Sequence, residues 1–326
     1  MAQSYKHLTH EEREKLVILK AQGLSLRQIA KALGRSHSSL SRELRRNAPL
    51  VRQGYYLPHK AQIRAAARKS KAHQRPRLKS ASIRRYVLRK IQAGLSPELI
   101  AGRIHRSISS HSVSHEAIYQ YLYLEAPDLV TFLPRAHRKR LKRWHSKKHA
   151  KSHIPQRVPI TQRPEIIARR IQFGHWEADT VISRKSLPSL LVLAERKSRL
   201  VKISWLPRKS ASSARKAINR RLAQLPKTSR RSITYDNGSE NVEHIKVNHT
   251  LGTKSYFCLP FHSWEKGTVE NIIGLVRRTF PKKTDFATIT TQQVKSLENR
   301  LNRRPRKCLR FQTPLEVYKK SGALTG

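Results

Sequence analysis

The chain has 326 residues, with 69 Lys and Arg against 20 Asp and Glu, and a formal net charge of +49. A positive charge of this size, spread along the whole chain, favours a polyanionic partner such as nucleic acid. No stretch approaches the ~18 consecutive apolar residues of a membrane helix, and the N-terminus lacks the apolar segment of a signal peptide. Cys258 and Cys308 provide neither a disulfide framework nor a zinc-ligand spacing. We therefore expect a soluble cytoplasmic protein, associated with the nucleoid if it is bacterial.

The first fifty residues have the pattern of three short helices separated by glycine turns. Thr9 and Glu12 form a capping-box pattern, Ser25 and Gln28 form a second one, and Ser36 is placed to cap a third helix. The second helix is short, as a helix-turn-helix requires. Residues 1–50 are therefore predicted to form a helix-turn-helix DNA-binding domain.

The third helix of such a domain enters the major groove with its N-terminal residues at the base edges. Leu40 and Leu44 would form its buried side. The outward residues, which we expect to contact DNA, are His37, Ser38, Ser41, Arg42, Arg45 and Arg46. A small three-helix bundle with a solvated basic face is the alternative, but the short second helix and the paired caps favour DNA binding.

The next hundred residues are predicted to be helical and then irregular. A basic, alanine-rich helical linker over 51–78 leads to a second helical domain over 79–128, in which Ser96-Pro97 marks a helix start. Its expected buried positions are Ile83, Val87, Ile91, Ile100, Ile104, Ile118 and Leu122. A second helix-turn-helix and a helical spacer are both compatible with this pattern.

A basic linker is expected over 129–168, because residues 129–164 contain no acid. Such a block is usually solvated. If it lies along DNA, its phosphate contacts would be independent of sequence and weakened by salt. Arg138, Lys139 and Arg140 are the contacts we expect there.

From residue 169 the hydrophobic period changes from helical to extended. The apolar segments run in the order three strands, helix, strand, short helix, strand and helix, which is the order of an α/β ribonuclease H-like fold with a five-stranded mixed sheet. The predicted strands are 175–183, 189–195, 199–206, 232–236 and 253–259, and the predicted helices begin at 210 and 264. The catalytic domain would span 169–326 and include a helical C-terminal extension.

Three acids occupy informative positions in this domain. Asp179 lies in the first strand, Asp236 ends the fourth, and Glu270 lies in the last of these helices. The first strand of this fold is central and the fourth lies beside it, so the three carboxylates would converge and repel each other without a cation. Hard divalent ions suit oxygen ligands, and we expect two Mg²⁺ ions, with Mn²⁺ as a substitute. Taken singly, each acid has a simpler explanation: a strand-end cap, an Asp-Asn-Gly turn, and a surface ion pair between Glu270 and Lys266.

Several motifs run nearly from end to end of the chain. They are Leu8-Thr9-His10-Glu11-Glu12-Arg13, Leu40-Ser41-Arg42-Glu43-Leu44, Ser96-Pro97-Glu98-Leu99-Ile100-Ala101-Gly102-Arg103, Gly174-His175-Trp176-Glu177-Ala178-Asp179, Tyr235-Asp236-Asn237-Gly238 and Trp264-Glu265-Lys266-Gly267-Thr268-Val269-Glu270-Asn271. In these motifs the chain resembles bacterial insertion-sequence transposases of the IS-thirty family, a DDE group.

The resemblance implies that Asp179, Asp236 and Glu270 are the catalytic metal ligands. It also implies that the N-terminal helices recognise the terminal inverted repeats of an element, and that one site cleaves DNA strands and transfers them to target DNA. Pairing two element ends suggests at least a homodimer. The chain departs from the family pattern at Ala178, Val269 and Ile273.

Two further features allow alternative interpretations. Arg277 and Arg278 could hold phosphates or form a basic outer helix face, and Trp264 could stack on a base or pack in a core or interface. At the level of the whole chain, the alternatives are a non-catalytic DNA-binding protein, such as a repressor with an inactive nuclease fold, and a ribosomal-type RNA-binding protein. The three acids and the helix-turn-helix pattern favour the transposase.

Overall fold

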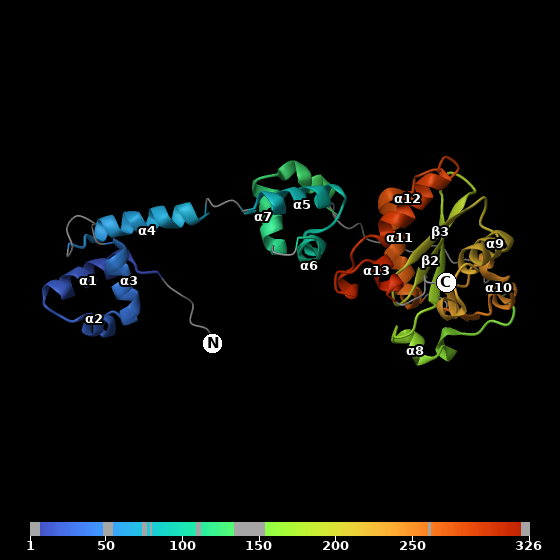
Figure 1. Cartoon of the computed structure of the whole chain (residues 1–326), viewed down its shortest axis with the longest axis horizontal. Coiled ribbons are helices and arrows are strands. Elements are labelled where there is room, and N and C mark those ends of the chain that lie inside the picture. Colours follow the sequence, from blue (N-terminus) through green and yellow to red (C-terminus); the bar gives the residue numbers. More distant parts are fainter. Residues whose placement is uncertain are drawn as a thin grey trace. The chain divides into compact units, whose positions relative to one another are not determined.

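The protein forms two compact units, Met1–Ser80 and Ala81–Gly326. The computed structural model describes residues 7–47, 55–73, 77–78, 80–108, 112–133, 154–259 and 262–320 (Figure 1). The first unit contains α1 (His10–Ala21), α2 (Leu26–Ala32), α3 (His37–Asn47) and α4 (Pro58–His73). Helices of the second unit are α5 (Ala81–Gln92), α6 (Pro97–Ser107), α7 (His115–Leu124), α8 (Glu165–Ala168), α9 (Ala211–Leu222), α10 (His244–Leu251), α11 (Gly267–Thr279), α12 (Thr291–Asn302) and α13 (Pro314–Lys319). Its strands are β1 (His175–Ile182), β2 (Ser189–Glu195), β3 (Val201–Leu206), β4 (Ser232–Tyr235) and β5 (Lys254–Phe257).

The first unit begins with the three predicted helices. Reciprocal capping boxes at Thr9 and Ser25 start α1 and α2. Leu40 of α3 is fully buried, whereas Leu44 is only partly buried. The helix expected between the two helical regions also forms: it is α4, and its Ala61 is buried in the same core. The basic segment after residue 50 therefore contributes to the packing of this unit.

A buried ion pair connects α1 to α3. Arg13 is 3% exposed, and its Nε donates to Glu43 Oε1 at 2.7 Å. The Tyr56 hydroxyl donates to the same oxygen at 2.9 Å. These bonds fix α3 against α1 because a buried charge is stable only when it is paired and hydrogen-bonded.

Helices α5 to α7 follow the predicted pattern. All seven expected apolar positions are buried, and Ser114 accepts a hydrogen bond from the Ala117 amide at 3.1 Å to cap α7. Within the second unit these helices contact the C-terminal segment. Arg103 of α6 pairs with Glu316 of α13. The Phe311 ring lies so close to Gly102 that a Cβ there would be 2.3 Å from a ring atom.

The five strands form one mixed sheet in the order β3-β2-β1-β4-β5. β1, β2 and β3 are antiparallel neighbours, while β4 and β5 run parallel to β1. This strand order confirms the predicted ribonuclease H-like class. Figure 1 shows α9 and α10 on one side of the sheet and α11 and α12 on the other.

Alternation along β1 divides its side chains between the two cores. Trp176 and Ala178 belong to the core on the α9 side, and Val181 belongs to the core on the α11 side. Because side chains alternate along a strand, Glu177 and Asp179 share the α11 side with Val181. The predicted common face of Glu177 and Asp179 is thus present.

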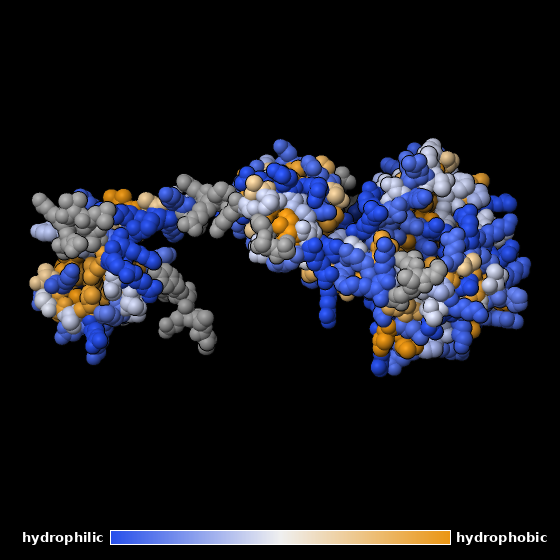
Figure 2. Space-filling model, in the orientation of Figure 1, coloured by the Kyte–Doolittle hydropathy of each residue, from blue (hydrophilic) through white to orange (hydrophobic). Residues whose placement is uncertain are grey.

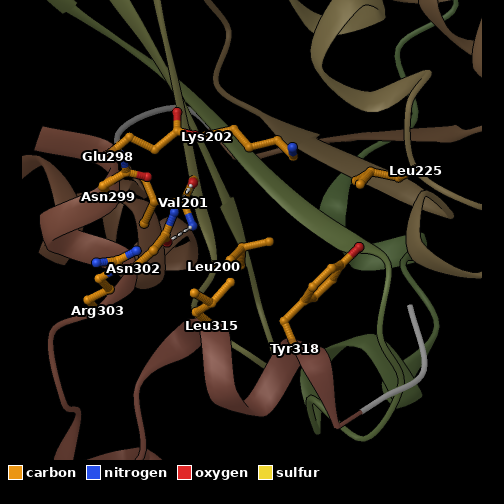
Figure 3. A pocket seen from close by; sticks show the side chains of 10 residues that line it. All are labelled: Leu200, Val201, Lys202, Leu225, Glu298, Asn299, Asn302, Arg303, Leu315 and Tyr318. Carbon is orange, nitrogen blue, oxygen red and sulfur yellow. Dashed lines mark hydrogen bonds between the residues drawn. The ribbon is translucent and has the colours of Figure 1, made fainter. Parts of the chain in front are cut away.

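Strand β3 forms one edge of the sheet, and side chains of α12 pair with its backbone. The Asn302 side chain accepts from the Val201 amide and donates to the Val201 carbonyl, each at 2.8 Å, and Glu298 accepts from the Ile203 amide at 2.6 Å. Pairing the edge in this way removes a site for unwanted strand addition. Figure 3 shows Val201, Glu298 and Asn302 among the residues that line a cavity of about 200 Å³. None of the three predicted catalytic acids lines this cavity.

The surface is hydrophilic over most of the face shown in Figure 2. Among the described residues, no helix combines the length and the apolarity needed to cross a membrane.

Candidate active site

Strand pairing places Asp179 and Asp236 beside each other. β1 and β4 are parallel with His175 opposite Ser232 and Glu177 opposite Thr234. Continuing this register by two residues sets position 236 next to position 179. The predicted convergence of these two acids therefore follows directly from the register.

Lys266 lies between the two carboxylates. Its Nζ atom is 3.3 Å from Asp179 Oδ2 and 3.5 Å from Asp236 Oδ2. The same ammonium group donates to the Ala178 carbonyl at 3.2 Å, and its side chain is 4% exposed. Lys266 belongs to η5 (Ser263–Lys266), the short helix that leads into α11. Two acids from neighbouring strands thus share one buried cation.

The charges of this cluster depend on one another. Burial raises the pKa of Asp179 above its ordinary value, and the Asp236 carboxylate adds to the increase while Lys266 opposes it. Burial alone would lower the pKa of Lys266, but the Asp179 and Asp236 carboxylates outweigh it and raise that pKa. The Lys266 ammonium group therefore favours the ionised form of Asp179, against the effect of burial.

Asp236 is held by the turn that follows it. The Asn241 side chain donates to Asp236 Oδ1 at 2.7 Å, and the Gly238 amide donates to the same atom at 3.3 Å. Asn237 donates to the Cys258 carbonyl at 2.8 Å. The chain bends at Asn237, and these hydrogen bonds to Asp236 Oδ1 leave Oδ2 directed at Lys266.

Glu270 is exposed, whereas the other two acids are partly buried. It is exposed in the first turn of α11, while Val269 is buried and Ile273 packs partly against the core on that side of the sheet. Among the described residues no group of three His, Cys, Asp or Glu side chains is placed to hold a metal ion. The structure thus brings together Asp179 and Asp236, but not Glu270. The alternative ion pair between Glu270 and Lys266 is wrong, because the acids that Lys266 contacts are Asp179 and Asp236.

Comparison with known proteins agrees with the sequence resemblance. A helix-turn-helix domain model matches residues 4–47. The transposase for insertion sequence element IS4351 of Bacteroides fragilis is 37% identical over 96% of this chain and 96% of its own length. The transposase InsI for insertion sequence element IS30A of Escherichia coli K12 is 35% identical over 98% of this chain and 85% of its own length.

The chain belongs to the insertion-sequence transposases of the IS-thirty family. Among solved structures, the catalytic core domain of BIV integrase matches 46% of this chain and 95% of that domain, with 20% identity and a TM-score of 0.37.

Glu177 is a residue of this transposase whose role the sequence did not reveal. It is fully buried, pairs with Arg196, and accepts the Val269 amide at 2.9 Å. This bond fixes the first turn of α11 to β1, next to Glu270. The sequence signal for this role was an acid two positions before Asp179, on the same face of the strand. Its partners, Arg196 and the Val269 amide, could be found only in the fold.

The predicted DNA contacts of α3 are accessible. All six side chains are exposed, as recognition of a groove requires, and Arg42 Nε also donates to the Ser38 carbonyl at 3.0 Å. Arg138, Lys139 and Arg140 lie outside the described residues. Near α11, Arg278 is exposed, whereas Arg277 donates to the Ile182 carbonyl at 2.7 Å and lies over the Phe286 ring. Trp264 is 67% exposed and stacks on His262, so it is not a core residue.

Proposed function

We propose that this chain is a DDE transposase that binds the terminal inverted repeats of an insertion sequence. It would catalyse metal-dependent DNA strand cleavage and strand transfer. The proposal rests on one observation: the Asp179 and Asp236 carboxylates contact the same buried cation, the ammonium group of Lys266. Membership of the transposase family gives this acid pair its most direct interpretation.

The residues present fit a divalent metal site in which Asp179 and Asp236 are the first two ligands. Both offer hard oxygen atoms, which Mg²⁺ prefers and Mn²⁺ also accepts. Their common partner is already a cation, so the position suits positive charge. Glu270 would be the third ligand, reaching the pair from the first turn of α11. Two bound ions would activate the attacking oxygen and stabilise the leaving oxygen of a phosphodiester.

Other side chains would prepare this site. Lys266 balances the two carboxylates until ions bind. Glu177 holds the Val269 amide and so limits the movement of the helix that carries Glu270. Fixing catalytic groups on rigid elements in this way reduces the reorganisation needed for reaction.

The exposed face of α3 would read the inverted repeats. Its hydroxyl groups allow close approach to the groove, and its arginines reach guanine edges or phosphates. Cleavage at two element ends and attack on target DNA would require a homodimer or a larger assembly on DNA.

The test is cleavage of an element end by the full chain in Mg²⁺. We expect Asp236→Asn to abolish cleavage and Asp285→Asn to retain it, because Asp285 is a partly exposed acid in another loop, where its carboxylate accepts a hydrogen bond from the Ala287 amide. Equal cleavage by wild type and Asp236→Asn would contradict the assignment. Specific DNA binding without cleavage in either Mg²⁺ or Mn²⁺ would instead support a repressor with an inactive nuclease fold.

A further inference from the structure

A second charged cavity lies beside α11. It has a volume of about 320 Å³, and its lining includes Arg170, Arg199, Thr268, Asn271 and Arg306. With 3.6 residues per turn, Thr268 lies about 200° around the helix from Glu270. Asn271, which also lines the cavity, lies about 100° from Glu270, so the cavity is on the flank of α11 next to the one that carries Glu270.

Three arginines from separate segments line this cavity, and no carboxylate lines it. Arg170 follows α8, Arg199 lies in the turn between β2 and β3, and Arg306 precedes η6 (Lys307–Leu309). Burial, followed by the nearby Arg304 and Arg199, lowers the pKa of Arg306 to about 10. Burial and then Arg199 lower the pKa of Arg170 as well. The fold thus holds positive charges close together where an anion would relieve their repulsion.

The arginine donors in the cavity are only partly used. Arg199 donates through Nη1 to Thr268 Oγ1 at 2.6 Å. Arg306 has two buried nitrogens, Nε and Nη2, without a hydrogen-bond partner among the described residues. A buried donor without a partner costs roughly 1–3 kcal/mol. A guanidinium fork matches the oxygens of a phosphate, so an anion of this kind is the ligand that three converging arginines favour.

Two of the three arginines, Arg170 and Arg199, have a left-handed backbone conformation. Arg170 and Arg199 have φ angles of 58° and 63°, and Arg310 and Phe311, in the turn after Arg306, have φ angles of 50° and 59°. This left-handed conformation costs roughly 1–2 kcal/mol for residues other than glycine. Such strain persists where the surrounding structure imposes it, often at ligand-binding positions.

We propose that Arg170, Arg199 and Arg306 form a pocket that binds a phosphodiester group of the DNA backbone, separate from the acid site. This pocket would hold DNA against α11, the helix that also carries Glu270. Phosphate contacts orient DNA without reading its sequence, so the pocket would serve any DNA that reaches the catalytic domain. The proposal rests on the proposed function, because its ligand is the DNA substrate.

The experiment measures DNA affinity of the full chain against salt concentration, with Arg306→Gln compared with wild type. The slope of log K against log salt is negative, and loss of one phosphate contact decreases its magnitude by about 0.9. We expect this decrease for Arg306→Gln. Arg303→Gln is the matched control: Arg303 is exposed three residues earlier and does not line the cavity, so its slope should remain that of wild type.

Thermal unfolding separates binding from a structural role. Arg306→Gln should unfold at the wild-type temperature or above, because it removes a buried charge with unpartnered donors. An unchanged salt slope would overturn the pocket, and so would a slope change shared by Arg303→Gln or a large decrease in Tm. If Arg306→Gln behaves like wild type while Asp236→Asn loses cleavage, the pocket is wrong and the proposed function stands. If Asp236→Asn cleaves normally, the proposed function is wrong whatever the slope.

Discussion

At the scale of single residues, the acid pair is organised around Lys266. Its ammonium group stands 3.3 Å and 3.5 Å from the two aspartates, where an entering divalent ion would carry the same sign of charge. We therefore expect metal ions to compete with Lys266 for the carboxylates. This competition makes Lys266 a counter-ion of the metal-free state.

Lys266→Met tests this role because it keeps the length of the side chain and removes its charge. In EDTA the variant should unfold at a lower temperature than wild type, because two partly buried acids lose their partner. We expect its free energy of unfolding to be lower by about 1–3 kcal/mol. Mn²⁺ binding, measured by titration calorimetry, should become tighter. Weaker Mn²⁺ binding would mean that Lys266 assists the metal and does not compete with it.

The sequence predicted the acids better than it predicted their partners. Asp179 and Asp236 could be placed because strand order fixes which strand ends are neighbours. Lys266 and Glu177 could not, because their contacts depend on how α11 approaches the sheet. The exposed position of Glu270 also escaped prediction: helical periodicity gives the buried face, but the rotation of the helix about its axis depends on packing in three dimensions.

At the scale of elements, α11 is fixed at its first turn by the bond from the Val269 amide to Glu177. Val269 and Ile273, which depart from the family pattern, face the core on this side of the sheet. They therefore contribute apolar packing that sets the position of the helix. The orientation of Glu270 depends on this packing and on Glu177.

Glu177→Gln should reduce cleavage even though it changes none of the three proposed metal ligands. It removes the partner of buried Arg196, which costs roughly 3–5 kcal/mol. A shift of α11 by about 1 Å can reduce the rate ~100-fold. Cleavage rates measured below the Tm of the variant provide the check. Glu195→Gln, a change of a buried acid bonded to Ser198, should have the smaller effect. An equal loss in both variants would indicate general destabilisation.

The contact of α6 with α13 should depend on pH. The hydrogen bond from Arg103 lowers the pKa of Glu316 to about 2 from an ordinary value of 4.5. A carboxyl group whose pKa is lower in the folded state stabilises the fold above its unfolded pKa, and this contribution is lost as pH falls through the folded pKa. The Tm difference between wild type and Glu316→Gln should thus be constant above about pH 5 and shrink towards pH 2.

Glu165→Gln is the control for this measurement of Tm against pH. Glu165 pairs with Arg169 on the surface, where both side chains are mostly exposed. Exposed pairs contribute little, so its Tm difference should be small at every pH. A Glu316→Gln difference that does not change with pH would mean that the ion pair does not hold α6 to α13.

Helix starts were the elements most easily predicted. The capping boxes at Thr9 and Ser25 and the cap at Ser114 are local patterns, and all three form. The docking of α4 on the first three helices was not predicted, because a basic, alanine-rich helix gives a weak apolar signal. Its burial depends on a few small side chains such as Ala61.

At the scale of the whole molecule, the proposed recognition face and the proposed catalytic acids lie in different units. The exposed face of α3 belongs to the first unit, and the acids belong to the second. Changes at the acid site should therefore leave recognition of element ends intact. On the proposed function, the net charge of +49 would attract DNA to both units, and the Asp179–Asp236 pair adds negative charge at one site in the second unit.

The central claim is that Asp179, Asp236 and Glu270 hold the same catalytic metals. Glu270 is the acid that the structure does not group with the other two. End cleavage by Glu270→Cys, measured in Mg²⁺ and in Mn²⁺, tests it most directly. A thiolate is a poor ligand for Mg²⁺ and a better one for softer ions. We expect the variant to bind element ends, to fail to cleave in Mg²⁺, and to recover cleavage in Mn²⁺. Cleavage at the wild-type rate in Mg²⁺, or no cleavage by the folded variant in either metal, would contradict the claim.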